Sequence, residues 1–305
     1  MTQHELDGYS IDQTPSVDLV TTTPQGEFVV RRMRRPEVDR AIDWAAAEGW
    51  NPGLNDAECF FAADPQGFFI GELNGQMIGS AFAVTYDEHY AFFGGYIVQP
   101  EFRHQGFGMQ ITRTWLAYVG DRNVGLDGVV SMESKYAMLG FRLAHRSIRY
   151  GGTAHGEGTI GFTEIVELAQ VPFEELAAYD RLHFSAPRPA FLRSWISQPG
   201  ATALGAVEGG RLVGYGVVRP CRVGYKIGPL FADRESIAED LFQSLSAVTA
   251  GQSIFLDVPE PHPRAMALAE RHGMKPVFEV ARMYRKTAPS VPMTHVFGVT
   301  TFELG

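Results

Sequence analysis

The segment from Tyr96 to Gly108 constrains the fold of this chain more than any other stretch of the sequence. An apolar strand ends at Pro100, and a loop with spaced glycines, Arg103-His104-Gln105-Gly106-Phe107-Gly108, leads directly into a helix. The first N–H groups of a helix have no internal partner and lie at the positive end of its dipole. Glycines let a phosphate approach such groups closely. The sequence therefore predicts an α/β unit whose helix start binds a diphosphate, with Arg103 adding a positive charge.

The spacing of this loop excludes the two commonest nucleotide-binding loops. The pattern is Arg-x-x-Gly-x-Gly, and neither a Walker loop nor a Rossmann fingerprint is present. It resembles the acyl-CoA motif of the GNAT superfamily of N-acyltransferases, which follows a strand that ends in Val-x-Pro. The resemblance implies that acetyl-CoA is the co-substrate and that it is bound by the strand end and the loop: Ile97, Val98, Arg103, His104, Gln105, Gly106, Phe107, Gly108 and Met109.

A second motif, Tyr136-Ala137-Met138-Leu139-Gly140-Phe141, is similar to the Tyr-x-x-Leu-Gly-Phe signature of the same superfamily. It begins 28 residues after Gly108, with a predicted strand between the two motifs. The resemblance implies that Tyr136 donates a proton to the departing CoA thiolate while an amine attacks the acyl thioester directly in a ternary complex. A phenol suits that role, because it is neutral at pH 7 and can hydrogen-bond a developing thiolate.

The chain is long enough for two domains, and its second half repeats features of the first. Gly75-Gln76-Met77-Ile78-Gly79 matches Gly210-Arg211-Leu212-Val213-Gly214, and Leu126-Asp127 matches Leu256-Asp257. A duplicated α/β unit explains these matches, although two unrelated α/β domains with similar turns would also produce them. The chain also resembles a bacterial GNAT group that carries a second GNAT-like domain. This implies an α/β (α+β) fold in which each domain has a mixed, mostly antiparallel twisted sheet flanked by helices.

We expect four segments along the chain. Residues 1–26 are expected to form a flexible tail, residues 27–150 the acyl-CoA-binding catalytic domain, and residues 151–159 a glycine-rich linker. Residues 160–305 form the second domain, which lacks the Arg-x-x-Gly-x-Gly loop and has Ala269 where the resemblance would place a tyrosine. The second domain is therefore expected to be a degenerate GNAT-like unit that walls the acceptor pocket.

The sequence identifies the base that removes a proton from the amine less clearly than it identifies the acid, Tyr136. Phe92-Phe93-Gly94-Gly95 occupies the strand in which many GNAT relatives place a carboxylate. We select Glu72 as the candidate base; the alternatives are Glu88, His89, Asp257, Glu260 and His262. The candidate acceptor-binding residues are Trp50, Asn51 and Asp257, because the region after the first helix lines the acceptor site in GNAT folds. Trp50 could equally complete the core.

Charge and composition narrow the choice of partner. A formal net charge of -9 disfavours nucleic acid and attracts a cationic amine. No apolar run reaches the ~18 residues that a membrane span needs, and the start of the chain is not a secretory signal, so we expect a cytoplasmic protein without membrane contact. The histidines and the two cysteines show no metal-ligand spacing, so no metal is expected. The final stretch, Thr294 to Leu304, alternates as a strand would and could pair within its own chain or in a homodimer.

Three functions remain open on these grounds. The first is transfer of an acetyl group from acetyl-CoA to the primary amine of a small molecule. The alternatives are acetylation of a protein, on lysine or an N-terminus, and non-catalytic sensing of acyl-CoA. Tyr136 argues against a sensor, because a pure binder does not need an acid for the thiolate. A second domain over the acceptor site favours a small, enclosed substrate.

Overall fold

The computed structural model describes residues 17–156 and 163–305 of the chain. Most of the expected tail (residues 1–16), the end of the expected linker (residues 157–159) and the first residues of the expected second domain (residues 160–162) lie outside the described residues. The rest of the tail prediction is wrong. Residues 17–23 form a strand, β1, that pairs antiparallel with the next strand. Its sequence, Val-Asp-Leu-Val-Thr-Thr-Thr, is rich in β-branched residues, which favour a strand.

The first half of the chain alternates strands with helices, and the glycine-rich loop lies between its fifth strand and its third helix. The strands are β1 (Val17–Thr23), β2 (Gly26–Arg32), β3 (Phe68–Leu73), β4 (Gln76–Thr85), β5 (Tyr90–Val98), β6 (Asn123–Val129) and β7 (Arg142–Thr153). The helices are α1 (Arg35–Ala47), α2 (Asp56–Ala63), α3 (Phe107–Val119) and α4 (Glu133–Met138), with short 3₁₀ turns η2 (Pro100–Phe102) and η3 (Val130–Met132).

The second half, up to its sixth strand, repeats the order of elements that the first half has from β2 onward, which confirms the predicted duplication of an α/β unit. The strands are β8 (Glu164–Glu167), β9 (Thr202–Glu208), β10 (Arg211–Pro220), β11 (Tyr225–Ala232), β12 (Ser253–Pro259), β13 (Lys275–Tyr284) and β14 (Val296–Gly298). The helices are α5 (Phe173–His183), α6 (Pro189–Ile196), α7 (Glu235–Ala247) and α8 (Pro263–Arg271), with turns η4 (Leu168–Gln170) and η5 (Met293–His295).

All of these strands belong to one continuous sheet. Its order is β1-β2-β3-β4-β5-β6-β13-β7-β12-β11-β10-β9-β8, and β14 pairs with β11 outside this path. Only β5–β6 and β11–β12 are parallel among the described pairs, because each is joined through a crossover helix, α3 or α7. The predicted mixed, mostly antiparallel sheet flanked by helices is thus confirmed.

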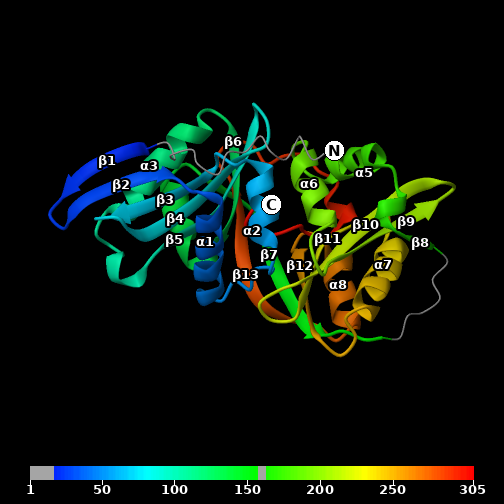
Figure 1. Cartoon of the computed structure of the whole chain (residues 1–305). Helices are drawn as coiled ribbons and strands as arrows, with labels where there is room; N and C mark the ends of the chain where they lie inside the picture. Colours follow the sequence, from blue (N-terminus) through cyan, green and yellow to red (C-terminus); the bar gives the residue numbers. More distant parts are fainter. Residues whose placement is uncertain (1–16, 157–162) are drawn as a thin grey trace.

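The two halves exchange their late strands at the centre of the sheet (Figure 1). β7, from the first half, pairs with β12 of the second half, while β13, from the second half, pairs with β6 of the first. β7 and β13 also pair with each other. The expected boundary at residues 151–159 therefore divides the chain in sequence but not in the sheet, since β7 continues to Thr153 and lies against the second half.

Two equivalent buried ion pairs hold the exchanged strands. Asp127 on β6 accepts two hydrogen bonds from Arg282 on β13, at 2.7 and 2.5 Å. Asp257 on β12 accepts two from Arg149 on β7, at 2.6 and 2.8 Å. The repeated Leu-Asp dipeptide of the sequence therefore supplies one carboxylate to each half for the arginine of the incoming strand.

Removal of one of these carboxylates is expected to destabilise the whole fold. Asp257→Asn leaves the Arg149 guanidinium, which is 3% exposed, without its counter-charge, so the free energy of unfolding should fall by about 3–5 kcal/mol. Urea denaturation measures the loss. Asp43→Asn is the matched control, because Asp43 pairs with Arg222 on the surface, where such pairs contribute about 0–1 kcal/mol. Equal losses in the two variants would contradict this account of the exchange.

Each crossover helix buries one apolar face against its half of the sheet. Ile111, Trp115 and Val119 of α3 are fully buried against the first half of the sheet, and Ile237, Leu241 and Leu245 of α7 are fully buried against the second. A third apolar cluster joins the halves, where Phe60 of α2 stacks on Trp195 of α6 with ring centroids 6.3 Å apart. No helix in residues 17–156 and 163–305 combines the length and the apolar character of a membrane span.

Candidate active site

The large cavity of the described structure lies beside the end of β5 and has a volume of about 590 Å³. Its walls come from both halves of the chain. The first half contributes the strand end, the glycine-rich loop and Tyr136, whereas the second half contributes Phe278 and Val280 of β13 and the C-terminal residues Phe302 and Glu303. The strand exchange is what brings β13 to this place, so neither half builds the cavity alone.

The glycine-rich loop forms a start for α3 with free main-chain donors. Gly106 is the N-cap of the helix and has a left-handed backbone with φ +89°, and His104 is also left-handed with φ +64°. The N–H groups of Gln105 to Gly108 have no backbone acceptor among the residues that the structure describes. Such a row of donors at a helix start is suited to a diphosphate.

The two glycines of the loop are needed for different reasons. A side chain at Gly106 would meet nothing within 4 Å, so the requirement there is its left-handed backbone. A Cβ at Gly108 would collide with the hydroxyl of Tyr96 on β5. Gly106 therefore sets the turn, and Gly108 sets the close packing of the helix start on the strand.

The side chains of the loop differ in their relation to the cavity. Arg103 lines it, but its guanidinium donates to the Val98 carbonyl at 2.7 Å and to Glu48 at 2.5 Å. His104 and Met109 also line the cavity. The side chains of Gln105 and Phe107 do not: Gln105 donates to the Glu101 carbonyl, and Phe107 is buried against Phe28 with centroids 4.8 Å apart. These two residues can therefore contribute to a diphosphate site only through their main-chain N–H groups.

β5 separates from β6 just before the loop. The parallel pairing of the two strands ends at Phe93 and Leu126, although β5 continues to Val98. On the other side, the register between β4 and β5 shifts between Ser80 and Phe82, opposite the left-handed Gly95. The backbone of Ile97 and Val98 therefore pairs with β4 alone and borders the cavity on its other side. An extended amide-bearing chain can pair with this edge, which no described strand covers, if it displaces Arg103 from the Val98 carbonyl.

Tyr136 lines the cavity from α4 and lies directly over β6. A Cβ at Gly128 would collide with the Tyr136 ring, so the glycine makes room for the phenol. The ring also makes edge contacts with Phe93 and Phe141, at centroid distances of 6.4 and 6.3 Å. Burial raises the pKa of Tyr136 well above its ordinary range, so the hydroxyl stays protonated at neutral pH and is available as a donor.

The other end of the cavity is formed by Trp50, Arg149, Phe302 and Glu303. Arg149 connects them: it donates to the Trp50 carbonyl at 2.6 Å, and its guanidinium lies 4.9 Å from the centre of the Phe302 ring. These residues come from the end of α1, from β7 and from the C-terminal segment. They form an aromatic and charged end opposite the glycine-rich loop.

Glu303 is a carboxylate that the sequence did not reveal as a site residue. The C-terminal segment crosses β5 at Gly94, where a Cβ would collide with the Glu303 carbonyl oxygen. The Tyr86 hydroxyl donates to the Leu304 carbonyl at 2.8 Å and fixes the segment, and the Thr301 hydroxyl donates to Glu303. The chain thus brings a carboxylate beside the strand in which the sequence has none. Gly94 is the signal in the sequence of this close approach.

Three other candidates lie outside the cavity, and the structure corrects their expected roles. Glu72, the candidate base, accepts hydrogen bonds from Arg31 on both oxygens, at 2.6 and 3.0 Å. Both carboxylate oxygens of Asp257 accept hydrogen bonds from Arg149. Arg149 lines the cavity, whereas Asp257 does not. Asn51 bonds the main chain of Val223 through both side-chain atoms and joins the two halves.

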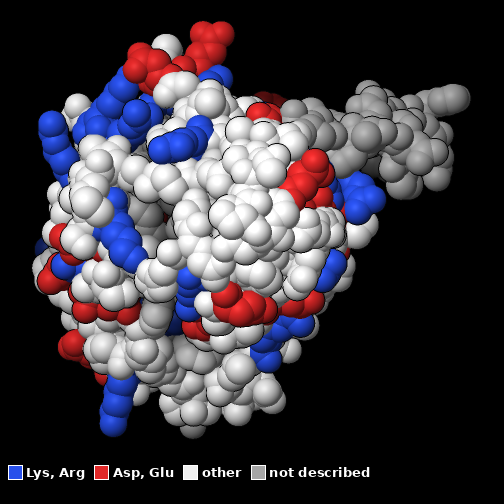
Figure 2. Space-filling model, turned by 90° about the vertical axis from the view of Figure 1, so that its left-hand side faces the viewer, with Lys and Arg blue, Asp and Glu red and all other residues white. Residues whose placement is uncertain are grey.

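Charge on the outer face does not indicate a polyanionic partner. Figure 2 shows the end of the molecule that carries the first half, where blue and red side chains are interspersed around a broad uncharged area. On this face, the described residues do not form the continuous basic stripe that nucleic-acid binding uses.

Sequence comparison agrees with this geometry in both halves. Residues 35–135 match the acetyltransferase (GNAT) family, and residues 176–298 match an acetyltransferase (GNAT) domain. The chain belongs to the GNAT acetyltransferases. This tandem GNAT is 28% identical to holothin acyltransferase from Pseudoalteromonas sp. (strain SANK 73390) over 264 residues, which cover 86% of this chain and 90% of the relative. It is 24% identical over 213 residues to the uncharacterized N-acetyltransferase YitH of Bacillus subtilis (strain 168), covering 68% and 74% of the two chains.

Solved structures share the tandem fold. A candidate acetyltransferase from Pyrococcus horikoshii superposes with a TM-score of 0.78 at 20% identity, covering 91% of this chain and 96% of its own. A tandem GNAT protein from the clavulanic acid biosynthesis pathway gives a TM-score of 0.62 at 16% identity, covering 86% and 99%. The tandem GNAT described here is therefore an acyltransferase of a family that uses acyl-CoA as the donor.

Proposed function

We propose that this tandem GNAT transfers an acetyl group from acetyl-CoA to the primary amine of a small molecule. One observation carries the proposal: a single cavity runs from the free N–H groups at the start of α3 to a buried carboxylate, Glu303, and is closed at that end by the second half. A relative named for a compound, holothin, supports a discrete acceptor.

The donor end fits acetyl-CoA in charge and shape. The pyrophosphate would accept hydrogen bonds from the N–H groups of Gln105 to Gly108, and the helix dipole would favour its charge. The pantetheine amides would pair with the free edge of β5 at Ile97 and Val98. This arrangement directs the thioester toward the part of the cavity that Tyr136 lines.

The acceptor end fits a compact amine. Phe302, Arg149 and Glu303 are 6%, 3% and 4% exposed, so an acceptor that reaches them leaves bulk solvent. The Glu303 carboxylate attracts an ammonium group, and the Trp50 and Phe302 rings can contact a flat or cationic body. To reach these buried residues, an amine of a folded protein would have to stand at the end of a long side chain. The burial of this end of the cavity therefore favours a small-molecule acceptor.

The residues in the cavity can perform the proton transfers of the reaction. Glu303 takes a proton from the ammonium group, directly or through a water molecule. The amine nitrogen then attacks the thioester carbonyl carbon, the C–N bond forms, and the C–S bond breaks. The attacking nitrogen is then cationic and loses its second proton to solvent as it becomes the amide. The Tyr136 hydroxyl donates its proton to the departing thiolate and takes a proton back from solvent. Glu303 releases to solvent the proton that it took from the ammonium group, so each turnover releases one proton in total.

The proposed function is tested by a screen for free-thiol release. The purified protein is mixed with acetyl-CoA and with polyamines, amino sugars, amino acids and heteroaromatic amines, and released thiol is measured. Turnover with at least one small amine is expected. Turnover only with peptides or proteins would replace the proposal by protein acetylation. Acetyl-CoA binding without turnover on any amine would favour a sensor.

Tyr136→Phe is expected to slow turnover by about 10- to 1000-fold and to leave the affinity for acetyl-CoA almost unchanged. The variant removes only the hydroxyl that protonates the thiolate, and the ring still packs on Phe93 and Phe141. Steady-state kinetics with a hit from the screen and a binding titration measure the two effects. Tyr150→Phe is the control, since Tyr150 also carries a phenol but does not line the cavity. Equal rates for wild type and Tyr136→Phe would exclude the acid role.

A further inference from the structure

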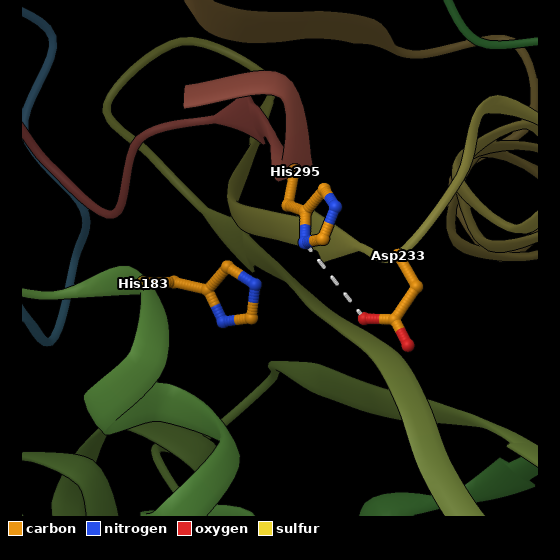
Figure 3. Close-up of side chains that lie close together, drawn as sticks. All are labelled: His183, Asp233 and His295. Atoms are coloured by element: carbon orange, nitrogen blue, oxygen red, sulfur yellow. Dashed lines mark ion pairs between the residues drawn. The ribbon is translucent and has the colours of Figure 1, made fainter. Parts of the chain in front are cut away.

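A second group of chemically reactive side chains lies in the second half, outside the acyl-transfer cavity. His183 at the end of α5, Asp233 just after β11 and His295 in η5 place their ligand atoms within 4.8 Å of one another (Figure 3). The three residues are 50 and 62 positions apart in the chain, so no local spacing motif announces them. This is why the sequence predicted no metal site.

His183 presents a free nitrogen to this group. Its Nδ1 lies 2.8 Å from the Tyr179 carbonyl oxygen, which can only accept, so Nδ1 carries the proton. Nε2 is consequently a lone-pair acceptor, and it is buried without a hydrogen-bond partner among the described residues. The residue is 5% exposed and stacks on Phe231 with centroids 5.0 Å apart. A buried acceptor without a donor is costly unless a cation binds it.

Tyr179 orients two members of the group at once. Its carbonyl fixes the tautomer of His183, and its hydroxyl donates to Asp233 Oδ1 at 2.8 Å. Supporting hydrogen bonds of this kind, from the distal N–H of a histidine to a carbonyl and from a hydroxyl to a carboxylate, are typical of metal ligands. The His295 Nδ1 atom lies 4.0 Å from the same Asp233 oxygen.

We propose that His183, Asp233 and His295 bind one divalent transition-metal ion of the zinc class, and that this ion fastens the C-terminal segment to α5 and β11. Two imidazoles and one carboxylate are the donor set that zinc prefers, whereas magnesium and calcium take oxygen ligands. Ligand atoms around tetrahedral zinc lie about 3.3 Å apart for bonds of ~2.0–2.1 Å. Small rotations of the Asp233 and His295 side chains, which are 43% and 35% exposed, would bring the three ligand atoms to that spacing. Water completes the coordination.

The position of His295 in the chain connects the proposed metal site to the acyl-transfer cavity. His295 directly precedes β14, and the chain then runs through Thr300 and Thr301 to Phe302 and Glu303 in the cavity. Arg188 also holds this segment, through Thr300 at 2.9 Å. A metal at His295 would anchor the start of the segment whose end brings Glu303 to the acceptor.

The test is a calorimetric titration of Zn²⁺ into the full-length protein, prepared without a polyhistidine tag and stripped with a chelator. One zinc per chain is expected, with an affinity that falls at least about tenfold in His295→Ala and in Asp233→Asn, because each removes one of three ligands. His89→Ala is the matched control, since His89 is an exposed histidine outside the group. Its affinity should equal that of the wild type.

Thermal unfolding provides a second readout that does not depend on catalysis. Zinc should raise the midpoint of wild type and His89→Ala, and should not raise that of His295→Ala, since a ligand that binds only the folded state stabilises it. Absence of zinc binding by the wild type would overturn the proposal. Unchanged binding in both His295→Ala and Asp233→Asn would also overturn it, because the ion would then bind elsewhere.

Discussion

Gly106→Val is expected to weaken acetyl-CoA binding by about 100-fold or more and to leave the protein folded. Gly106 is the left-handed N-cap of α3, a backbone conformation that a β-branched residue adopts only with strain of ~1–3 kcal/mol. The loop relieves that strain by changing its conformation, and the free N–H groups of Gln105 to Gly108 then no longer converge. Loss of two or three such charge-assisted hydrogen bonds accounts for the expected drop. Calorimetric titration of acetyl-CoA measures it.

Gly251→Val separates the loss of binding from the loss of stability. Gly251 is also left-handed, with φ +80°, and a side chain there would also meet nothing within 4 Å, but it lies in a turn of the second half away from the cavity. The two variants should lose similar stability in urea denaturation. Only Gly106→Val should lose acetyl-CoA binding. Loss in both variants would mean that general strain, not the loop, is responsible.

Glu303→Gln is expected to lower kcat by about 100- to 10,000-fold, with the affinity for acetyl-CoA unchanged. Glutamine keeps the size of the side chain and can still accept from the Thr301 hydroxyl, but it cannot take a proton from the ammonium group. Steady-state kinetics with an amine acceptor, over a range of pH, measure the effect. At high pH, where more of the amine is already deprotonated, the variant should recover part of its rate.

Glu88→Gln makes the same chemical change on the surface and should leave kcat unchanged, because Glu88 is exposed at the turn before β5. A large loss of kcat in Glu88→Gln, with no loss in Glu303→Gln, would identify Glu88 as the base. A loss in Glu303→Gln that appears only in the affinity for the amine would make Glu303 a binding residue.

The sequence predicts the donor side of the site well because that side is local. The strand, loop and helix around Gly106 are contiguous, and Tyr136 follows on the next strand-helix unit. Their residue types alone determine a turn, a helix start and a phenol over a strand. The structure places Ile97, Val98, Gly108 and Tyr136 around one cavity, and the binding of acetyl-CoA there stays a prediction.

The acceptor side could not be predicted in the same way, because it depends on contacts between distant segments. Arg149 reaches the cavity only because β7 leaves its own half, and Glu303 only because the C-terminal segment crosses β5 at Gly94. The repeated Leu-Asp dipeptide was visible in the sequence, but its arginine partners were not assigned. The sequence therefore predicts Asp257 to be a substrate residue, whereas in the structure it holds Arg149 in place.

We propose that the main-chain groups that bind acetyl-CoA come from the first half and that the second half completes the acceptor end. The most direct test is the stoichiometry of acetyl-CoA binding to the wild-type protein, measured by calorimetry at known active concentration. The account predicts one acetyl-CoA per chain, and none for Gly106→Val under the same conditions. Two molecules per chain would contradict the assignment of a degenerate second half, and no binding to the wild type would contradict the donor site itself.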